Sequence, residues 1–244
     1  MKKILVSQKA PSNITPYAAL EAKFGAKLEF TPFFLIEPLS AKEFRAERIN
    51  LPDYTAVVFS SRHAIDAYFK LCEEMRFKVP ETMKYFCTTE LVAIYLQKHV
   101  VYRKRKIFFG DGTPESVVAL IGPKHKGEKF LITKSADANS DAITGQFDKA
   151  GLDYSVAVLV KSVAQDLKAL DLSSYDTIVL YNPFDVKSLF ENFPGYAQGS
   201  TEIITYGKSI VKAAEEAGLN VSLQAPTAEI PSVVKALELH LSAK

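Results

Sequence analysis

Residues 56–69 have the sequence AVVFSSRHAIDAYF, in which four apolar residues precede a polar turn and a helical pattern. The apolar run is short and uninterrupted, which is typical of a parallel strand buried on both faces of its sheet. After the turn, the spacing of Ile65, Tyr68 and Phe69 places them on one face of a helix. A strand that leads directly into a helix is the unit of a parallel α/β sheet.

The same pattern returns half a chain later. Residues 177–190, TIVLYNPFDVKSLF, again run from an apolar strand through a polar turn into a helix. The units that follow, residues 84–91 and 204–211, also resemble each other. Short apolar runs and helical patterns alternate along the rest of the chain, so we expect two similar α/β halves with mainly parallel sheets.

Two long extended stretches suggest where the halves meet. Residues 27–40 and 154–166 are long and extended, and both carry β-branched or aromatic side chains. A pair of crossovers would make the first domain discontinuous. We therefore expect a first domain of residues 1–36 plus 164–244, a second of residues 37–163, and linker strands near residues 30–38 and 156–166.

Composition narrows the possible functions. With 48% hydrophobic and 24% charged residues, the 244-residue chain is globular rather than disordered or collagen-like. A net charge of +2 is too small to indicate a polyanionic binding partner, so we expect no nucleic-acid partner. No apolar run is long enough for a bilayer or a signal peptide, and two cysteines without CxxC spacing suit a reducing cytoplasm. Four scattered histidines predict no metal site.

Polar turns after the predicted strands are the candidate binding residues. Ligands of open α/β sheets bind beyond the carboxyl ends of the strands, where free backbone N–H groups of helix N-termini attract anions. The alternative is that these Ser, Thr and Asn residues are ordinary helix N-caps. No dinucleotide motif, P-loop or nucleophile elbow occurs. The candidate anion-binding residues are Ser60, Ser61, Arg62, Thr88, Thr89, Glu90, Gly110, Asn182, Pro183, Gly207, Lys208 and Ser209.

Reactive side chains are few. Tyr181 and Tyr206 end predicted strands, where each could donate a proton to a ligand or simply pack as a half-buried aromatic. Cys87 also ends a strand and could be a reactive thiol or a buried core residue. The basic run at residues 102–106 is either a solvated loop or a patch that steers anions or contacts nucleic acid.

Several short motifs occur in a specific order along the chain. They are ILVSQK at residues 4–9, FSSRHAI at 59–65, LYNPFDV at 180–186, GKSIV at 207–211, GLNV at 218–221 and PTAE at 226–229. Their order and spacing resemble the uroporphyrinogen-III synthase family over nearly the whole chain. Residues 85–87 and 102–110 look like the branch of that family found in Bacteroidetes-type bacteria.

The resemblance implies both a fold and a reaction. The implied fold is two similar Rossmann- or flavodoxin-like α/β domains, joined by a two-stranded extended linker with a cleft between them. The implied reaction takes hydroxymethylbilane, removes its hydroxyl as water, inverts ring D and closes the macrocycle to uroporphyrinogen III for heme biosynthesis. It implies no cofactor and no metal. We expect a cytoplasmic monomer whose partner is this small-molecule tetrapyrrole.

The sequence departs from the family pattern at positions that bear on activity. Gln8 stands where arginine is common, and Glu90 and Ile210 stand where the family has threonine. Val160 aligns with a tyrosine proposed as the acid for loss of the hydroxyl. The alternative function is therefore a divergent, non-catalytic two-domain paralogue that binds an anionic small molecule. Otherwise another tyrosine replaces the phenol; the candidates are Tyr154, Tyr181 and Tyr206.

Overall fold

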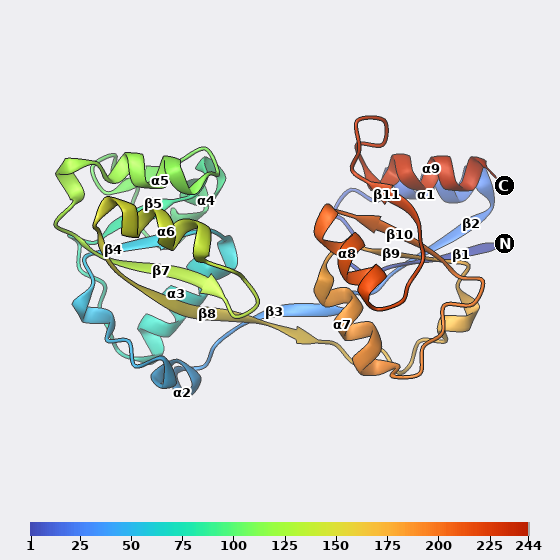
Figure 1. The fold of residues 1–244 in the computed structure, drawn as a ribbon, viewed down its shortest axis with the longest axis horizontal. Coiled ribbons are helices and arrows are strands. Elements are labelled where there is room, and N and C mark those ends of the chain that lie inside the picture. The colour runs from blue at the N-terminus through green and yellow to red at the C-terminus, as the bar shows by residue number, and fades with distance from the viewer. Residues whose placement is uncertain (244) are drawn as a thin grey trace. The chain divides into compact units, whose positions relative to one another are not determined.

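The chain forms two compact α/β units. The computed structural model describes residues 1–243. Unit 1 contains residues 1–35 and the chain from Val163 onward, and unit 2 contains Ile36–Ser162. The chain passes between the units twice, in strands β3 (Phe34–Pro38) and β8 (Asp153–Ala164), which are neighbours in one sheet (Figure 1).

Unit 1 contains a five-stranded sheet in the order β11-β10-β9-β1-β2, and its paired neighbours are parallel. Its strands are β1 (Lys2–Val6), β2 (Ala26–Phe30), β9 (Thr177–Leu180), β10 (Glu202–Tyr206) and β11 (Val221–Ala225). These strands are short, and the central strands β10, β9 and β1 are largely buried, as the uninterrupted apolar runs predict.

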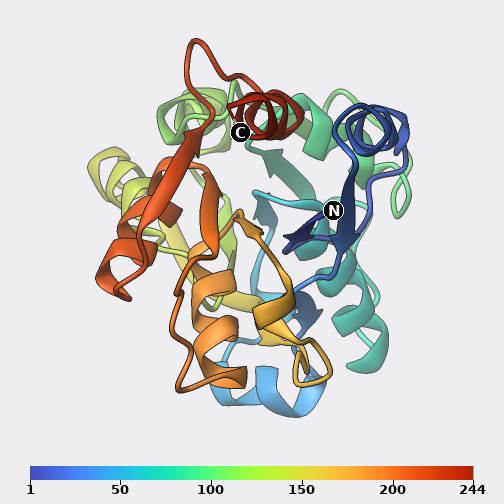
Figure 2. The ribbon, with the colours of Figure 1, turned by 90° about the vertical axis from the view of Figure 1, so that its right-hand side faces the viewer.

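Helices cover both faces of this sheet. They are α1 (Thr15–Phe24), α7 (Pro183–Asn192), α8 (Lys208–Glu216) and α9 (Val233–Ser242). The alternation of side chains along β1 assigns the faces, because Ile4 packs in the core with residues of α1 and α9. The next residue, Leu5, packs in a second core with residues of α7 and α8. Figure 2 shows α1 and α9 side by side, away from α7 and α8.

Unit 2 contains a six-stranded sheet in the order β3-β8-β7-β4-β5-β6. The added strands are β4 (Ala56–Phe59), β5 (Lys84–Cys87), β6 (Ile107–Phe109) and β7 (Lys129–Ser135). Helices α3 (Arg62–Glu74) and α4 (Glu90–Leu96) share a core with Phe59 on one face. Helices α5 (Pro114–Ile121) and α6 (Asp141–Ala150) share a core with Phe86 on the other.

The remaining elements of the described chain are short. They are helix α2 (Ala41–Phe44) and the 3-10 turns at Arg45–Glu47, Leu51–Asp53, Pro123–His125 and Leu172–Ser174. Helix α2 begins with a capping box, in which the Ser40 hydroxyl accepts from the amide of Glu43 and the Glu43 carboxylate accepts from the amide of Ser40.

The predicted α/β class with two parallel sheets is confirmed, and some boundaries were wrong. Residues 27–40 form two strands in different sheets, because Phe33 is fully buried in the core of unit 1 and interrupts the extended stretch. Helix α4 ends at Leu96, where the backbone turns. Helix α2 was not predicted. Within residues 1–243, every helix is too short or too polar to span a bilayer.

Candidate functional site

In unit 2, three of the predicted turns lie next to one another at the carboxyl edge of the sheet. The amide of Thr88, after β5, donates to the carbonyl of Phe59 at the end of β4, at 2.9 Å. The amide of Gly110, after β6, donates to the carbonyl of Cys87 at 3.0 Å. The parallel register of β4, β5 and β6 therefore brings the turns at residues 60–62, 88–90 and 110 together.

The turns at residues 60–62 and 88–90 also cap the helices that follow them. The Ser61 hydroxyl accepts from the amide of Ala64 at 3.1 Å, and the Thr89 hydroxyl accepts from the amide of Val92 at 3.4 Å. The N-cap interpretation thus holds for these two side chains. Ser60, Arg62 and Glu90 make no such cap and are exposed.

The charged members of these turns differ in what they offer a ligand. The Arg62 guanidinium lies over the ring of Tyr95, 5.4 Å from its centroid, so the cation is held near the start of α3. Glu90 is the first residue of α4, where its negative charge complements the helix dipole. Arg62 therefore suits an anionic ligand, whereas Glu90 suits a hydrogen-bond donor or the helix itself.

Gly110 is required by close packing. A Cβ atom at this position would lie 2.1 Å from the Ser116 hydroxyl and 3.3 Å from the carbonyl oxygen of Thr88. The Ser116 hydroxyl is itself engaged, because it accepts from the amide of Asp111 and donates to the carbonyl of Thr113. Any side chain at residue 110 would disturb this loop.

In unit 1, the carboxyl ends of β1, β9 and β10 carry the second set of turns. Asn182 caps α7 through its Oδ1, which accepts from the amide of Phe184 at 2.8 Å, and Pro183 occupies the first helical turn. Helix α8 has no side-chain cap: it begins after Gly207, whose φ of 130° favours glycine. Lys208 and Ser209 are exposed at this open end, which is a favourable place for an anion.

Asp185 is a part of this edge that the sequence interpretation missed. It is fully buried, and its Oδ2 accepts hydrogen bonds from the Ser7 hydroxyl and from the amides of Tyr181 and Asn182, at 2.7–3.0 Å. Burial raises the pKa of Asp185 above its usual value, and these hydrogen bonds oppose the rise. The Asn-x-x-Asp spacing is a capping-box signal that could have identified Asp185.

The two predicted tyrosines lie together. The rings of Tyr181 and Tyr206 are 5.6 Å apart, and the phenol of Tyr181 also meets that of Tyr17 on α1. Burial raises the pKa of Tyr181, so its phenol stays protonated. The Tyr206 hydroxyl makes one long hydrogen bond, 3.4 Å to the carbonyl of Pro231. We call Tyr17, Tyr181 and Tyr206 the tyrosine cluster; the contribution of Tyr17 was not predicted.

Of the three other candidates, two lie at the amino edge of the sheet, away from these turns, and the third is buried. Tyr154 is near the start of β8, at the amino edge of the sheet, and its hydroxyl donates to Asp148 at 2.9 Å. The basic run at residues 102–106 precedes β6, again at the amino edge. Cys87 is fully buried, and burial raises the pKa of its thiol to about 12, so the reactive-thiol interpretation is wrong.

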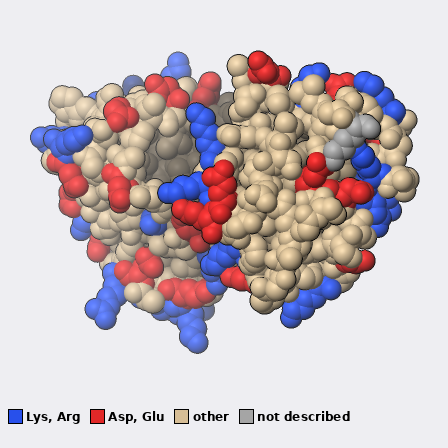
Figure 3. All heavy atoms as spheres, turned by 45° about the vertical axis from the view of Figure 1, so that its right-hand side comes forward, with Lys and Arg blue, Asp and Glu red and all other residues tan. Residues whose placement is uncertain are grey.

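Charged side chains of both signs occur on the surface. On the face drawn in Figure 3, basic and acidic side chains are interspersed.

Two of the residues that depart from the family pattern lie in hydrophobic cores. Val160 is 3% exposed in the core of unit 2, and Ile210 is fully buried in a core of unit 1. Both residues therefore serve as core packing, and neither offers a polar atom to a ligand.

Comparison with known proteins identifies the family. The family model described as uroporphyrinogen-III synthase HemD matches residues 15–235 of the chain.

The chain belongs to this family. Its fold is similar to that of uroporphyrinogen-III synthetase from Helicobacter pylori, with 16% identity, a TM-score of 0.59 and full coverage of both chains. It is also similar to a mutant uroporphyrinogen III synthase from Thermus thermophilus, with 12% identity, a TM-score of 0.56, and coverage of 100% of this chain and 98% of the other. No curated protein matches the chain significantly.

Family membership confirms the main functional prediction. The chain is a cyclising lyase of tetrapyrrole biosynthesis, and no finding favours the non-catalytic paralogue. Its partner is a tetrapyrrole. Within residues 1–243, no three His, Cys, Asp or Glu side chains are grouped so that they could hold a metal ion.

Proposed function

We propose that the chain converts hydroxymethylbilane to uroporphyrinogen III by holding acetate and propionate groups of the substrate at its exposed carboxyl-edge turns. The observation that carries this proposal is the set of exposed polar turns, which includes the uncapped start of α8 and the cation of Arg62. Backbone N–H groups and helix dipoles bind carboxylates without needing a lysine or arginine for each one.

This mode of binding suits the chemistry. Once the hydroxyl has left as water, the reactive end of the bilane closes without further activation, and in solution it gives the type I isomer. Closure to type III requires that ring D be held so that its substituted carbon is attacked first. Holding several carboxylates fixes that geometry, and positioning of this kind contributes much of the rate and all of the choice of isomer. Few catalytic side chains are then needed.

Within the tyrosine cluster, we assign the two predicted catalytic residues different roles. Tyr206 supplies the proton to the departing hydroxyl, because its phenol is half-exposed and has only a 3.4 Å hydrogen bond among the described residues. Tyr181 positions the ring of Tyr206 by packing against it, since its own phenol faces Tyr17. This assignment supplies the acid that Val160 cannot.

The test is a coupled assay with hydroxymethylbilane generated in situ, followed by oxidation and chromatographic separation of the porphyrin isomers. We expect excess type III with the native protein. Tyr206→Phe should lower the rate of type III formation by about 10²-fold, the usual effect of losing a general acid. Tyr181→Phe should have a smaller effect, because it keeps the ring.

Tyr175→Phe is the matched control. Tyr175 is a buried tyrosine of the same unit and lies two residues before the first residue of the strand that Tyr181 follows, so it lies at the opposite edge of the sheet. Its substitution should leave the isomer ratio unchanged. Native rates in Tyr206→Phe would remove the assigned acid. Formation of type I alone by the folded native protein would contradict the proposed reaction.

A further inference from the structure

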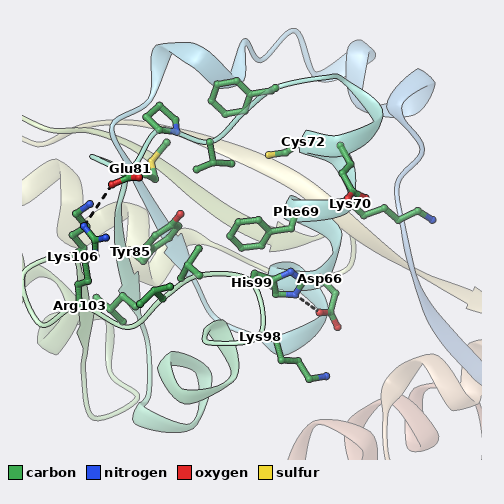
Figure 4. Close-up of a pocket in the computed structure, with 18 residues that line it drawn as sticks. Asp66, Phe69, Lys70, Cys72, Glu81, Tyr85, Lys98, His99, Arg103 and Lys106 are labelled. Atoms are coloured by element: carbon green, nitrogen blue, oxygen red, sulfur yellow. Dashed lines mark hydrogen bonds and ion pairs between the residues drawn. The ribbon is translucent and has the colours of Figure 1, made fainter.

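Unit 2 contains a pocket of about 690 Å³ that is separate from the carboxyl-edge turns. Its lining comes from α3, the segment before β5, the start of β5 and residues 98–107 (Figure 4). None of residues 60–62, 88–90 or 110 belongs to the lining. The volume falls within the roughly 300–1,000 Å³ of small-molecule sites, so the pocket is large enough for a ligand of several rings.

Part of the pocket is lined by aromatic side chains. Phe69 of α3 stacks on the ring of His99, with centroids 4.5 Å apart and planes 4° from parallel. His99 is fixed in this position by Asp66, whose Oδ1 is 2.8 Å from its Nε2. Tyr85 and Met83 complete the apolar surface. The Phe69 and Tyr85 rings are also in contact, with centroids 6.4 Å apart and planes tilted by 42°, so this aromatic surface favours an aromatic ligand that packs against it.

Tyr85 adds a polar group inside the pocket. The residue is 4% exposed, and its hydroxyl points into the pocket in Figure 4. No hydrogen-bond partner for this hydroxyl is found among residues 1–243. The hydroxyl is therefore free to donate a hydrogen bond to an acceptor atom of a ligand.

The charges around the opening favour an anion. Four basic side chains and three acidic ones line the pocket. Two of the acidic side chains, Asp66 and Glu81, already interact with other residues. Asp66 already accepts from Tyr95 and His99, and these hydrogen bonds outweigh the effect of burial and lower its pKa. Glu81 is 3.6 Å from Arg103. Lys106 has no acidic partner among the described residues and is half-buried at the edge of the pocket.

We propose that this pocket binds an aromatic, largely apolar carboxylate, with its rings against the lining side chains of Phe69, His99 and Tyr85 and its carboxylate at Lys106 and Arg103. The Tyr85 hydroxyl donates a hydrogen bond to that carboxylate. The site is distinct from the proposed substrate-binding turns, so its ligand is a second molecule rather than the bilane being cyclised.

Fluorescence of 8-anilinonaphthalene-1-sulfonate, an aromatic, largely apolar anion, tests the proposal with the full chain. We expect saturable, one-site enhancement that 2-naphthoate reverses and the uncharged 2-naphthamide does not. Lys106→Gln and Tyr85→Phe should each weaken binding about tenfold, the effect of losing one hydrogen bond to a charged group. Lys104→Gln is the matched control, because Lys104 is in the same segment but does not line the pocket.

Thermal unfolding and the isomer assay are run on every variant. Lys106→Gln and Lys104→Gln should keep native unfolding midpoints and native type III formation, which separates this site from the reaction. Absence of saturable binding, equal competition by the amide and the carboxylate, or equal affinities of Lys106→Gln and Lys104→Gln would each overturn the proposal.

Discussion

The hydroxyl of Ser7 donates a 2.7 Å hydrogen bond to Oδ2 of Asp185, which is 178 residues away in the sequence. The same oxygen accepts from the amides of Tyr181 and Asn182. One buried carboxylate therefore ties the end of β1 to the end of β9 and to the start of α7. Tyr181 belongs to the tyrosine cluster, and its amide is one of the donors to this carboxylate. The connection therefore helps to position the tyrosine cluster at the proposed catalytic edge of unit 1.

Removing the carboxylate should be costly for stability. Asp185→Ala leaves three buried donors without their acceptor, and we expect the free energy of unfolding to fall by about 3 kcal/mol. Ser7→Ala loses one donor to a charged group and should cost about 1.5 kcal/mol. Urea denaturation of both single variants and the double variant measures their coupling, which we expect to be about 1 kcal/mol. Additive effects would show that the two side chains do not interact.

The buried carboxyl of Asp185 should also make stability depend on pH. Its pKa is raised in the folded state, so the native protein binds this proton more tightly than the unfolded chain. The contribution to stability is present below the ordinary pKa and is lost as pH rises through the raised value. The Asp185→Asn variant lacks this titratable carboxyl group. The stability of the native protein relative to Asp185→Asn should therefore increase in urea titrations as pH falls from 7 to the ordinary aspartate pKa of about 3.9; parallel curves would contradict this.

Gly110→Ala should disturb the third turn of unit 2. The new Cβ would meet the Ser116 hydroxyl at 2.1 Å and a backbone oxygen at 3.3 Å. We expect a loss of about 1–3 kcal/mol of stability, as for other overpacked sites. Gly127→Ala is the control, because a Cβ there meets nothing within 4 Å, and thermal unfolding compares the two. Equal midpoints would mean that the loop yields without cost.

Restoring a tyrosine at residue 160 should not restore a catalytic group. Val160 is 3% exposed in a packed core, so Val160→Tyr should cost about 1–3 kcal/mol by overpacking and should not increase type III formation. Val158→Tyr, in the same strand but half-buried, is the control and should cost less. A faster Val160→Tyr enzyme would show that the phenol reaches the substrate.

Most of the fold was predictable because it depends on local patterns. The apolar runs at residues 56–59 and 177–180 are strands buried on both faces, and the helices that follow them begin where Ser61 and Asn182 cap them. The stretch at residues 27–40 was harder. Only the burial of Phe33 in one unit decides that the chain continues as β3 in the sheet of the other.

The site was predictable in part. Strand-end turns could be located from the sequence, and the structure places those at residues 60–62, 88–90 and 110 next to one another. The role of Asp185 was not recognised, although its spacing from Asn182 carried a signal. Tyr17 had no signal at all, because its contact with Tyr181 depends on how α1 packs on the sheet.

Periodicity and turn chemistry determined the strands and the helices of this protein, since these depend on neighbours within a few residues. Tertiary structure alone decided which side chains meet. The register shift between Lys134 and Ser135 turns Val160 to the same core as Leu159, although strict alternation would face it the other way. Such contacts join residues far apart in the chain, and no local pattern encodes them.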